Sequence, residues 1–302
     1  MWRRWTQAVR DWAYRGRPEV APVRIGVALS GGFARVMTHV GVLQVLEENH
    51  IPVYAITGIS SGAIIAAAYA AGSTTEEIKS TGAMTSFSSY ARWTLSKLGL
   101  AVNDRMTTYL QKILLHTRFE EMRIRLGVVA TDLTTGQPVV FQGLGDVIDP
   151  IRATCAYPGF FLPVEIGGRW LVDGGISVNA PVEAAAELGA THVLAVYLRT
   201  APESNGPPGN IFQVVSRSFA IMQDRLRMEW EHIPHLVLEP DVTDFAWDDF
   251  DRVPEMVEAG RRAALAALPQ IQRWPVREEE AFLPLLTPPA KSPAASGRAG
   301  ES

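Results

Sequence analysis

Residues 54–72 read YAITGISSGAIIAAAYAAG, which predicts a short buried strand, a sharp turn and an Ala-rich helix. The turn has the form Gly-x-Ser-x-Gly, with Ser60 at its centre. This spacing is typical of a nucleophile elbow, because glycines at 58 and 62 relieve crowding around a strained serine. The following helix points its N-terminus at Ser60 and favours negative charge there. The alternative interpretation is a glycine-flanked turn before an ordinary core helix.

A second strand–turn–helix unit precedes the elbow. Arg24–Ser30 reads as a buried strand, Gly31–Gly32 as a tight turn, and Ala34–Asn49 shows helical periodicity. Two consecutive βα units predict a parallel sheet that carries its functional groups at the carboxyl ends of the strands. We therefore expect an α/β fold in which Gly31–Gly32 lies beside Ser60.

The rest of the chain continues the alternation of helices and strands. Strands are expected at Leu126–Thr131 and Pro138–Gln142, which form a hairpin, and at Trp170–Val172, Val193–Leu198 and Leu236–Leu238. Helices are expected at Arg105–Leu115, Val147–Thr154, Pro181–Leu188, Ile211–Glu231 and Pro254–Leu268, with Ser73 or Thr74 capping a short one before them. Met84–Leu100 is less regular. We interpret it as a surface helix or flap, with an ordinary core helix as the favoured alternative.

Composition limits the class of protein. With 302 residues and 47% hydrophobic residues, one large domain is expected, and we place it at residues 23–275. A net charge of -4 gives no reason to expect nucleic acid as a partner. Cys155 is the single cysteine, so no internal disulfide is expected. No apolar run is long enough to span a bilayer and no signal peptide is recognised, so we expect a cytoplasmic protein.

The two ends of the chain differ from the middle in composition. Residues 1–22 are basic and place Trp2, Trp5 and Trp12 at helical spacing, which suits peripheral membrane contact through residues 1–17. A helix docked on the domain by its Trp face is an equal alternative, and a mitochondrial presequence is a weaker one. Residues 276–302 form a tail rich in Pro, Ala and Ser that we expect to be disordered.

Asp173 is the second catalytic candidate. It opens an Asp-Gly-Gly turn directly after a short predicted strand, from which it can reach a neighbouring elbow. A serine hydroxyl needs a base to become a nucleophile, and the six histidines do not sit in a loop signature typical of catalysis. A carboxylate base is therefore expected, although an Asp-Gly pair is also common in structural turns.

The glycine turn after the first strand is a candidate oxyanion site. Backbone N–H groups at Gly31 and Gly32 are suited to hold a developing negative charge, and Arg35 adds a fixed positive charge. The alternative is a plain βα turn with a surface arginine. A dinucleotide site would need Gly-x-Gly-x-x-Gly, which is not present here.

These motifs together resemble the patatin-like phospholipases. That family has a Gly-Gly-Gly-x-Arg/Lys-Gly loop, a Gly-x-Ser-x-Gly elbow and an Asp-Gly-Gly or Asp-Gly-Ala loop, in this order. The matching stretches here are Gly31–Val36, Gly58–Gly62 and Asp173–Gly175. Flanking stretches are also similar, and the resemblance covers about residues 23–270: His39–Leu43, Ala130–Gly136, Ile151–Gly159 and Asn179–Pro181.

The resemblance implies a three-layer α/β/α fold with a mainly parallel central sheet, and a lipid acyl hydrolase that uses a Ser–Asp dyad. Ser60 would be the nucleophile and Asp173 the base, while Gly31, Gly32 and Arg35 would form the oxyanion site. The implied partner is a lipid substrate, and no cofactor or metal is implied.

Two positions depart from the family pattern. Phe33 and Val36 stand where the family has its third and fourth glycines. If the third position requires a positive φ, Phe33 is strained and the oxyanion N–H is misaimed. Two alternatives therefore stay open. One is an α/β-hydrolase with a Ser-Asp-His triad that uses His232 or His235, and the other is a catalytically weakened lipid-binding or scaffold protein.

Overall fold

The computed structural model of the protein describes residues 23–85, 87–89, 91–94, 96–199, 206–226, 230 and 232–274. The basic segment at residues 1–22 and the tail at residues 276–302 lie outside these ranges. Among the helices that are described, none combines the length and the apolar character needed to cross a membrane.

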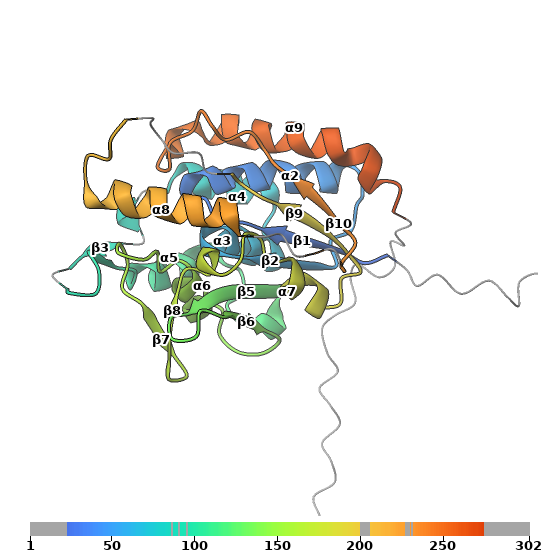
Figure 1. Ribbon diagram of the computed structural model, residues 1–302. Coiled ribbons are helices and arrows are strands. Elements are labelled where there is room, and N and C mark those ends of the chain that lie inside the picture. The colour runs from blue at the N-terminus through green and yellow to red at the C-terminus, as the bar shows by residue number, and fades with distance from the viewer. Residues whose placement is uncertain are drawn as a thin grey trace, which may run out of the picture.

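A mainly parallel sheet forms the centre of the molecule (Figure 1). Its described strands are β1 (Ile25–Leu29), β2 (Ala55–Gly58), β5 (Arg125–Asp132), β6 (Pro138–Gln142), β7 (Val164–Ile166), β8 (Arg169–Val172), β9 (His192–Val196) and β10 (His235–Leu238). They lie in the order β10–β9–β1–β2–β5–β8–β7, and β6 also pairs with β5. The first five strands in this order are parallel, whereas β6, β7 and β8 pair antiparallel. The predicted hairpin of β5 and β6 is thereby confirmed.

Helices cover both faces of the sheet. They are α2 (Met37–Glu48), α3 (Ser60–Ala70), α4 (Thr75–Ala83), α5 (Arg105–Ile113), α6 (Ile148–Thr154), α7 (Val182–Glu187), α8 (Ile211–Arg225) and α9 (Val253–Ile271). Along β1, Val27 and Leu29 join the main core with α2, α3 and α9, whereas Ala28 points to a smaller core with α7. This alternation confirms the expected three-layer α/β/α architecture.

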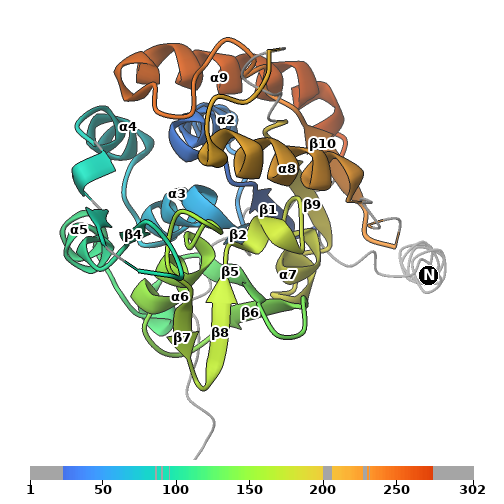
Figure 2. The same ribbon diagram turned by 60° about the vertical axis from the view of Figure 1, so that its left-hand side comes forward.

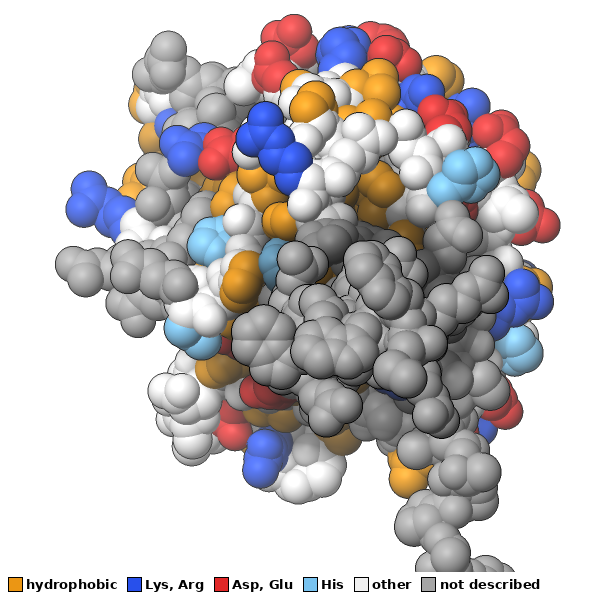
Figure 3. All heavy atoms as spheres, turned by 90° about the vertical axis from the view of Figure 1, so that its right-hand side faces the viewer, with side chains coloured by type: hydrophobic (Ala, Val, Ile, Leu, Met, Phe, Trp, Pro, Cys, Tyr) orange, Lys and Arg blue, Asp and Glu red, His pale blue; other side chains and the backbone are white. Residues whose placement is uncertain are grey.

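The site lies at the carboxyl edge of the sheet. Figure 2 brings this side forward and shows α3 at its centre, with α4 and α5 beside it. The opposite end, seen in Figure 3, presents acidic and basic side chains intermixed around atoms drawn in grey. Such a mixture on the visible surface does not favour a polyanionic partner there.

Helices α2 and α9 touch through two glycines. A Cβ atom at Gly41 would overlap the carbonyl oxygen of Val257, and one at Gly260 would overlap the carbonyl oxygen of Thr38. The two helix backbones therefore approach as closely as only glycine permits. In Figure 1 they lie together on one side of the sheet, where α9 covers α2.

The interpretation of Met84–Leu100 as a helix is wrong. The segment contains a one-turn 3₁₀ helix (Phe87–Ser89) and strand β3 (Arg92–Trp93), which forms a hairpin with β4 (Ala101–Val102). The backbone N–H groups of Leu100 and Ala101 donate to the carbonyl oxygen of Phe160 at 2.9 and 2.8 Å. A distant turn thus provides the hydrogen bonds that a helix would form internally.

Smaller differences occur at the ends of other elements. The long helix α8 ends at Arg225 and not at Glu231, and strand β7 has no counterpart in the prediction. Pro181 caps α7 instead of occupying its first helical position. Thr74, one of the two predicted caps, does cap α4, and it forms a capping box with Glu77.

The contact between α2 and α9 generates a stability prediction. Gly260→Ala should lower the free energy of unfolding by about 1–3 kcal/mol, because the added methyl group forces the helices apart. Gly206→Ala is the matched control, since a Cβ there meets nothing within 4 Å. Chemical denaturation of the three proteins measures the difference. Equal unfolding midpoints for the Gly260 variant and the native protein would contradict the close contact.

Candidate active site

The predicted elbow at Ser60 has a strained backbone. Strand β2 ends at Gly58, Ile59 is extended, and α3 begins at Ser60. Ser60 has φ = 50°, in the left-handed region that residues other than glycine rarely adopt. Its N–H donates to Thr154 Oγ1 at 2.9 Å, and Thr154 Oγ1 in turn donates to the carbonyl oxygen of Val129. The neighbouring strand and helix therefore hold the turn in place.

The two glycines of the motif are required by close contacts. A Cβ at Gly58 would lie 2.7 Å from the backbone nitrogen of Ala63, in the first turn of α3. A Cβ at Gly62 would overlap the carbonyl oxygen of Ser30, next to the glycine turn. The prediction that glycine relieves crowding at both positions is confirmed. Gly62 also brings the start of α3 against the loop that follows β1.

Asp173 lies buried at the end of β8, with 2% of its surface exposed. Its Oδ1 accepts a hydrogen bond from the N–H of Gly175 at 2.8 Å. Thr131 Oγ1 donates to the Asp173 carbonyl oxygen at 2.9 Å, and the Asp173 N–H donates to the carbonyl oxygen of Ala156 at 3.1 Å. These contacts from β5 and from the end of α6 fix the aspartate in one position.

The structure brings Ser60 and Asp173 together. Burial raises the pKa of Asp173 to about 6, while the nearby Ser60 hydroxyl and the Gly175 N–H act to lower it. The other carboxylate oxygen, Asp173 Oδ2, is buried and has no hydrogen bond of regular geometry among the described residues. At neutral pH most of this carboxyl group is ionised beside the serine. Such a group is suited to accept a proton from the hydroxyl.

The glycine loop lies against the serine side chain. A Cβ at Gly31 would be 2.7 Å from the Cβ of Ser60, which confirms that the two turns are neighbours. Among the described residues, no acceptor receives a hydrogen bond from the N–H of Gly31 or of Gly32. The loop that contacts the serine at Gly31 thus carries two backbone donors with no acceptor among the described residues. This arrangement is suited to stabilise a negative oxygen.

Phe33 has the positive φ that its position in the loop was suspected to require. Its φ is 53°, a conformation that glycine adopts at lower cost. Its ring centroid lies 5.4 Å from that of Tyr157 and 5.4 Å from that of Trp247. The N–H of Ala34 donates to the carbonyl oxygen of Trp247 at 2.9 Å. Aromatic packing and this bond hold the strained residue in place.

Arg35 is buried and has a structural contact. Its Nε donates to the carbonyl oxygen of Phe245 at 2.8 Å, and 7% of the residue is exposed. The guanidinium therefore ties the glycine loop to the segment before α9. Its predicted contribution to the oxyanion site stays a prediction.

His39 supports this loop, a role that was not predicted from the sequence. His39 is fully buried, and its Nε2 lies 2.9 Å from the carbonyl oxygen of Ser30. Because a carbonyl oxygen only accepts, Nε2 carries the proton and donates. Burial lowers the pKa of His39 to about 4, so the ring is neutral at physiological pH. Its place in the stretch His39–Leu43 was the only signal in the sequence.

His235, which was considered as a possible triad base, does not lie on the side of the sheet that carries Ser60. His235 begins β10, which runs parallel to β9, and therefore lies at the amino edge of the sheet. Ser60 follows the carboxyl end of β2, at the opposite edge. The ring of His235 packs on Trp230, with centroids 5.6 Å apart. His232 precedes the same strand in the chain.

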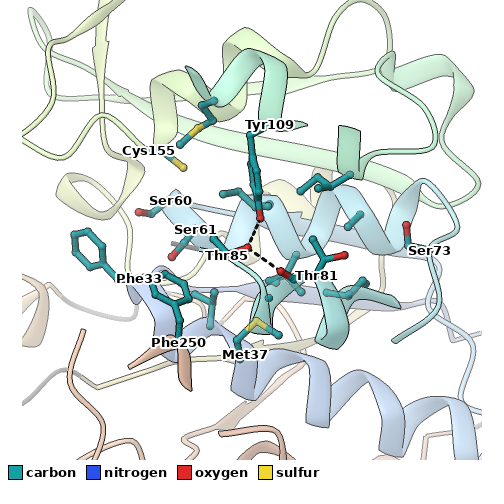
Figure 4. A pocket seen from close by; sticks show the side chains of 18 of the residues that line it. Phe33, Met37, Ser60, Ser61, Ser73, Thr81, Thr85, Tyr109, Cys155 and Phe250 are labelled. Atoms are coloured by element: carbon teal, nitrogen blue, oxygen red, sulfur yellow. Dashed lines mark hydrogen bonds between the residues drawn. The ribbon is translucent and has the colours of Figure 1, made fainter. Parts of the chain in front are cut away.

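An elongated cavity of about 320 Å³ begins at Ser60. It follows α3 between α4 and α5 (Figure 4). Its walls are mainly apolar side chains: Phe33, Val36, Met37, Ile64, Ile65, Ala68, Ile78, Met106, Tyr109, Ile113, Tyr157, Phe161 and Phe250. Cys155 also lines it, and burial raises the pKa of this thiol, which stays neutral. An apolar cavity next to a strained serine is suited to hold a hydrocarbon chain.

Relatives with similar sequences are known. One is an uncharacterized NTE family protein of Mycobacterium tuberculosis, 33% identical over 188 residues, which are 62% of this chain and 52% of the relative. Another is the lysophospholipase NTE1 of Cryptococcus neoformans var. neoformans, 29% identical over 57% of this chain and 11% of that protein. The chain thus spans about half the length of its mycobacterial relative.

Among solved structures, VipD from Legionella pneumophila is similar over 84% of this chain and 69% of its own, with 13% identity and a TM-score of 0.49. A score of this size supports no inference about function. The family comparison is more specific, because the model of the patatin-like phospholipases matches residues 27–186. That span is more than half of the chain and holds the glycine loop, the elbow and the Asp-Gly-Gly loop in order. The protein is therefore a member of the patatin-like phospholipase family.

Proposed function

We propose that this protein is a serine lipid acyl hydrolase that cleaves carboxylic ester bonds of phospholipids or related lipids through a Ser60–Asp173 dyad. The observation that carries the proposal is the position of Ser60. Its hydroxyl lies beside a buried carboxylate, and its side chain opens into an apolar cavity. Membership of the patatin-like phospholipase family supports the same chemistry.

In the first half of the reaction, Ser60 Oγ attacks the acyl carbonyl carbon and its proton passes to Asp173. The electron pair of the carbonyl moves to its oxygen, which the N–H groups of Gly31 and Gly32 stabilise. Collapse of this intermediate breaks the bond to the alcohol oxygen, which leaves with the proton from Asp173. The acyl group remains bound to Ser60 as an ester.

In the second half, Asp173 removes a proton from water, which attacks the acyl-enzyme. Collapse returns the proton to Ser60 and releases the fatty acid. The positive end of the α3 dipole points toward Ser60 and favours both negative intermediates. The raised pKa of Asp173 makes the carboxylate a stronger base than an exposed aspartate.

Labelling with a fluorophosphonate tests the nucleophile. The probe should label the native protein and also Ser80→Ala. Ser80 is the control because it is exposed on α4, where its hydroxyl donates to the carbonyl oxygen of Glu76, and it does not line the cavity. Ser60→Ala should lose labelling, and its ester hydrolysis should fall by roughly a thousandfold or more. Mass spectrometry of the labelled peptide locates the site. Labelling at Ser61 would show that Ser61 is the nucleophile. If the folded native protein is not labelled at all, the lipid-binding or scaffold alternative is favoured.

The pH dependence of hydrolysis tests the base. Asp173 acts in its ionised form and has a pKa of about 6, so kcat/KM should be level above pH 6 and fall about tenfold per unit below it. Asp173→Asn should abolish activity about as completely as Ser60→Ala, because the pair acts as a unit. A histidine titrates in the same range, so His232→Gln and His235→Gln serve as controls. If either of these variants folds but loses its activity, or loses the fall of kcat/KM below pH 6, the Ser-Asp-His triad is favoured.

Phe33 provides a test of backbone strain in the glycine loop. Phe33→Gly and Phe33→Ala both remove the ring from between Tyr157 and Trp247, but only glycine removes the cost of φ = 53°. The glycine variant should therefore be more stable than the alanine variant by about 1 kcal/mol. Denaturant titrations of the two variants measure this difference. Equal stabilities would mean that the loop relaxes to a negative φ once the ring is gone.

The proposal extends to membrane contact by residues 1–17, which lie outside the described ranges. A charge near an anionic surface adds about 1 kcal/mol, so several arginines give weak, salt-sensitive binding. Removing residues 1–17, so that the chain starts at Pro18, should abolish co-sedimentation with anionic vesicles and leave the melting temperature unchanged. A lower melting temperature with unchanged sedimentation would instead indicate a segment docked on the domain.

A further inference from the structure

The cavity beside Ser60 runs along helix α3. The side chains of Ser60, Ile64 and Ala68 line it from one face of α3, a span of about 12 Å at the helical rise of about 1.5 Å per residue. The side chain of Asn103, just before α5, donates to the carbonyl oxygen of Arg152 in α6 at 2.7 Å, so α5 starts near Ser60. After α5, the N–H of Arg123 donates to the carbonyl oxygen of Ala70 at 2.8 Å. The chain that enters α5 near the start of α3 therefore returns to the end of α3 after α5.

The two ends of the cavity differ in polarity. Near Ser60 it is lined by the buried side chains of Cys155, Tyr157 and Phe161. At the far end it is lined by Glu77 and Lys112, both exposed, and by Leu115, of which 59% is exposed. The cavity thus runs from the half-buried Ser60, next to these buried side chains, to an end beyond α3 whose walls are exposed to solvent.

A hydrogen bond crosses the cavity between these ends. Tyr109 on α5 and Thr85 just after α4 both line the cavity, and their hydroxyl oxygens lie 2.8 Å apart. Thr85 Oγ1 donates its single proton to the carbonyl oxygen of Thr81 at 2.8 Å, so Tyr109 is the donor to Thr85. Figure 4 shows Tyr109 reaching from α5 to Thr85, with Ser60 and Ser61 on one side and Ser73 on the other.

Met37 narrows the cavity at the same level. A Cβ at Gly82, on α4, would lie 2.5 Å from the Cε of Met37, and both residues line the cavity. Figure 4 places Met37 below Thr85 and Tyr109. We refer to Tyr109, Thr85 and Met37 as the waist. It is formed by Met37 of α2, by Thr85 just after α4 and by Tyr109 of α5, whose ring crosses the cavity and is hydrogen-bonded to Thr85.

From this arrangement we infer that the cavity is a site for one acyl chain and that Tyr109 limits the length of the chain it accepts. The inference rests on the proposed function for the chemistry at Ser60, but the cavity itself can be tested without any reaction. An extended chain advances about 1.2 Å per bond, so the half of the cavity before the waist, about 6 Å, holds roughly five bonds. Chains longer than about six carbons have to pass the ring of Tyr109.

Binding of straight-chain alcohols from four to sixteen carbons tests the waist in the native protein. These ligands carry no ester and no charge, so calorimetric titration measures the cavity whether or not the protein hydrolyses lipids. Affinity should rise about fourfold per methylene up to about six carbons and then level off. A steady rise to the longest alcohol would overturn the inference.

Variants identify the residue that sets this limit. In Tyr109→Ala the rise should continue beyond about six carbons, whereas Tyr109→Phe, which loses the hydrogen bond but keeps the ring, should behave as the native protein does. Gly82→Ala pushes Met37 toward the cavity, so its affinities should level off at a shorter chain. Tyr54→Ala is the control, because Tyr54 packs under the guanidinium of Arg125, 4.1 Å from its ring centre, and does not line this cavity.

Each outcome decides one question. The same length limit in folded Tyr109→Ala and in the native protein would overturn the role of Tyr109. If Tyr109→Ala does not fold, as judged by circular dichroism, Gly82→Ala decides, and an unchanged limit there overturns the waist. The rates of hydrolysis of acyl esters of the same lengths are a second measurement. If the affinity for alcohols levels off at this chain length but the protein neither hydrolyses esters nor reacts with the probe, the result would support the waist and reject the proposed function.

Discussion

The left-handed backbone of Ser60 is the constraint on which the site depends. A residue other than glycine in this conformation costs about 1–2 kcal/mol, so the surrounding structure has to hold it. Here the N–H of Ser60 is bonded to Thr154, and the missing side chain of Gly62 lets α3 press against the Ser30 carbonyl. The same contact sets the glycine loop beside the serine. Strain at one residue thus positions both the hydroxyl and the unused N–H donors.

Burial adjusts the proton affinities around this turn in opposite directions. It raises the pKa of Asp173 to about 6, which makes the carboxylate more basic and still leaves most of it ionised at neutral pH. It lowers the pKa of His39 to about 4, so this residue supports the Ser30 carbonyl as a neutral donor. A protonated histidine there would favour the ionised carboxylate and weaken the base. The dry surroundings are therefore part of the proposed chemistry.

One helix serves both the elbow and the cavity. The first residue of α3 is Ser60, and a face of the same helix forms the floor along which an acyl chain would lie. Small side chains such as Ala68 leave room above this floor, while Ala66 and Ala67 pack into the core. Helix α4, which forms another wall of the cavity, begins with a capping box at Thr74 that fixes its first turn. The reacting carbon and the tail of the chain are consequently aligned by one rigid element.

Local patterns in the sequence determined the elbow, the glycine turn and the parallel sheet. Their signals are a spacing of two residues around Ser60 and the periodicity of the flanking segments, which depend only on nearby residues. The Asp-Gly-Gly loop was recognised for the same reason. Which ionisable group meets the serine was settled by the tertiary structure. The direction of β10 places His235 at the amino edge of the sheet, and the pairing of β8 with the end of β5 places Asp173 on the side of Ser60.

Three further features had no local signal. The hairpin of β3 and β4 is anchored by two hydrogen bonds to the carbonyl oxygen of Phe160. The positive φ of Phe33 is held by Tyr157 and Trp247, and the cavity is enclosed by faces of α3, α4 and α5. In each case the partners lie far apart in the chain and meet only after the sheet has formed. A periodic pattern shows that a helix buries one face, but not which other helix leaves a gap beside it. The space for the acyl chain is therefore a property of the packed molecule, because it is bounded by side chains from segments that have no contact until the chain folds.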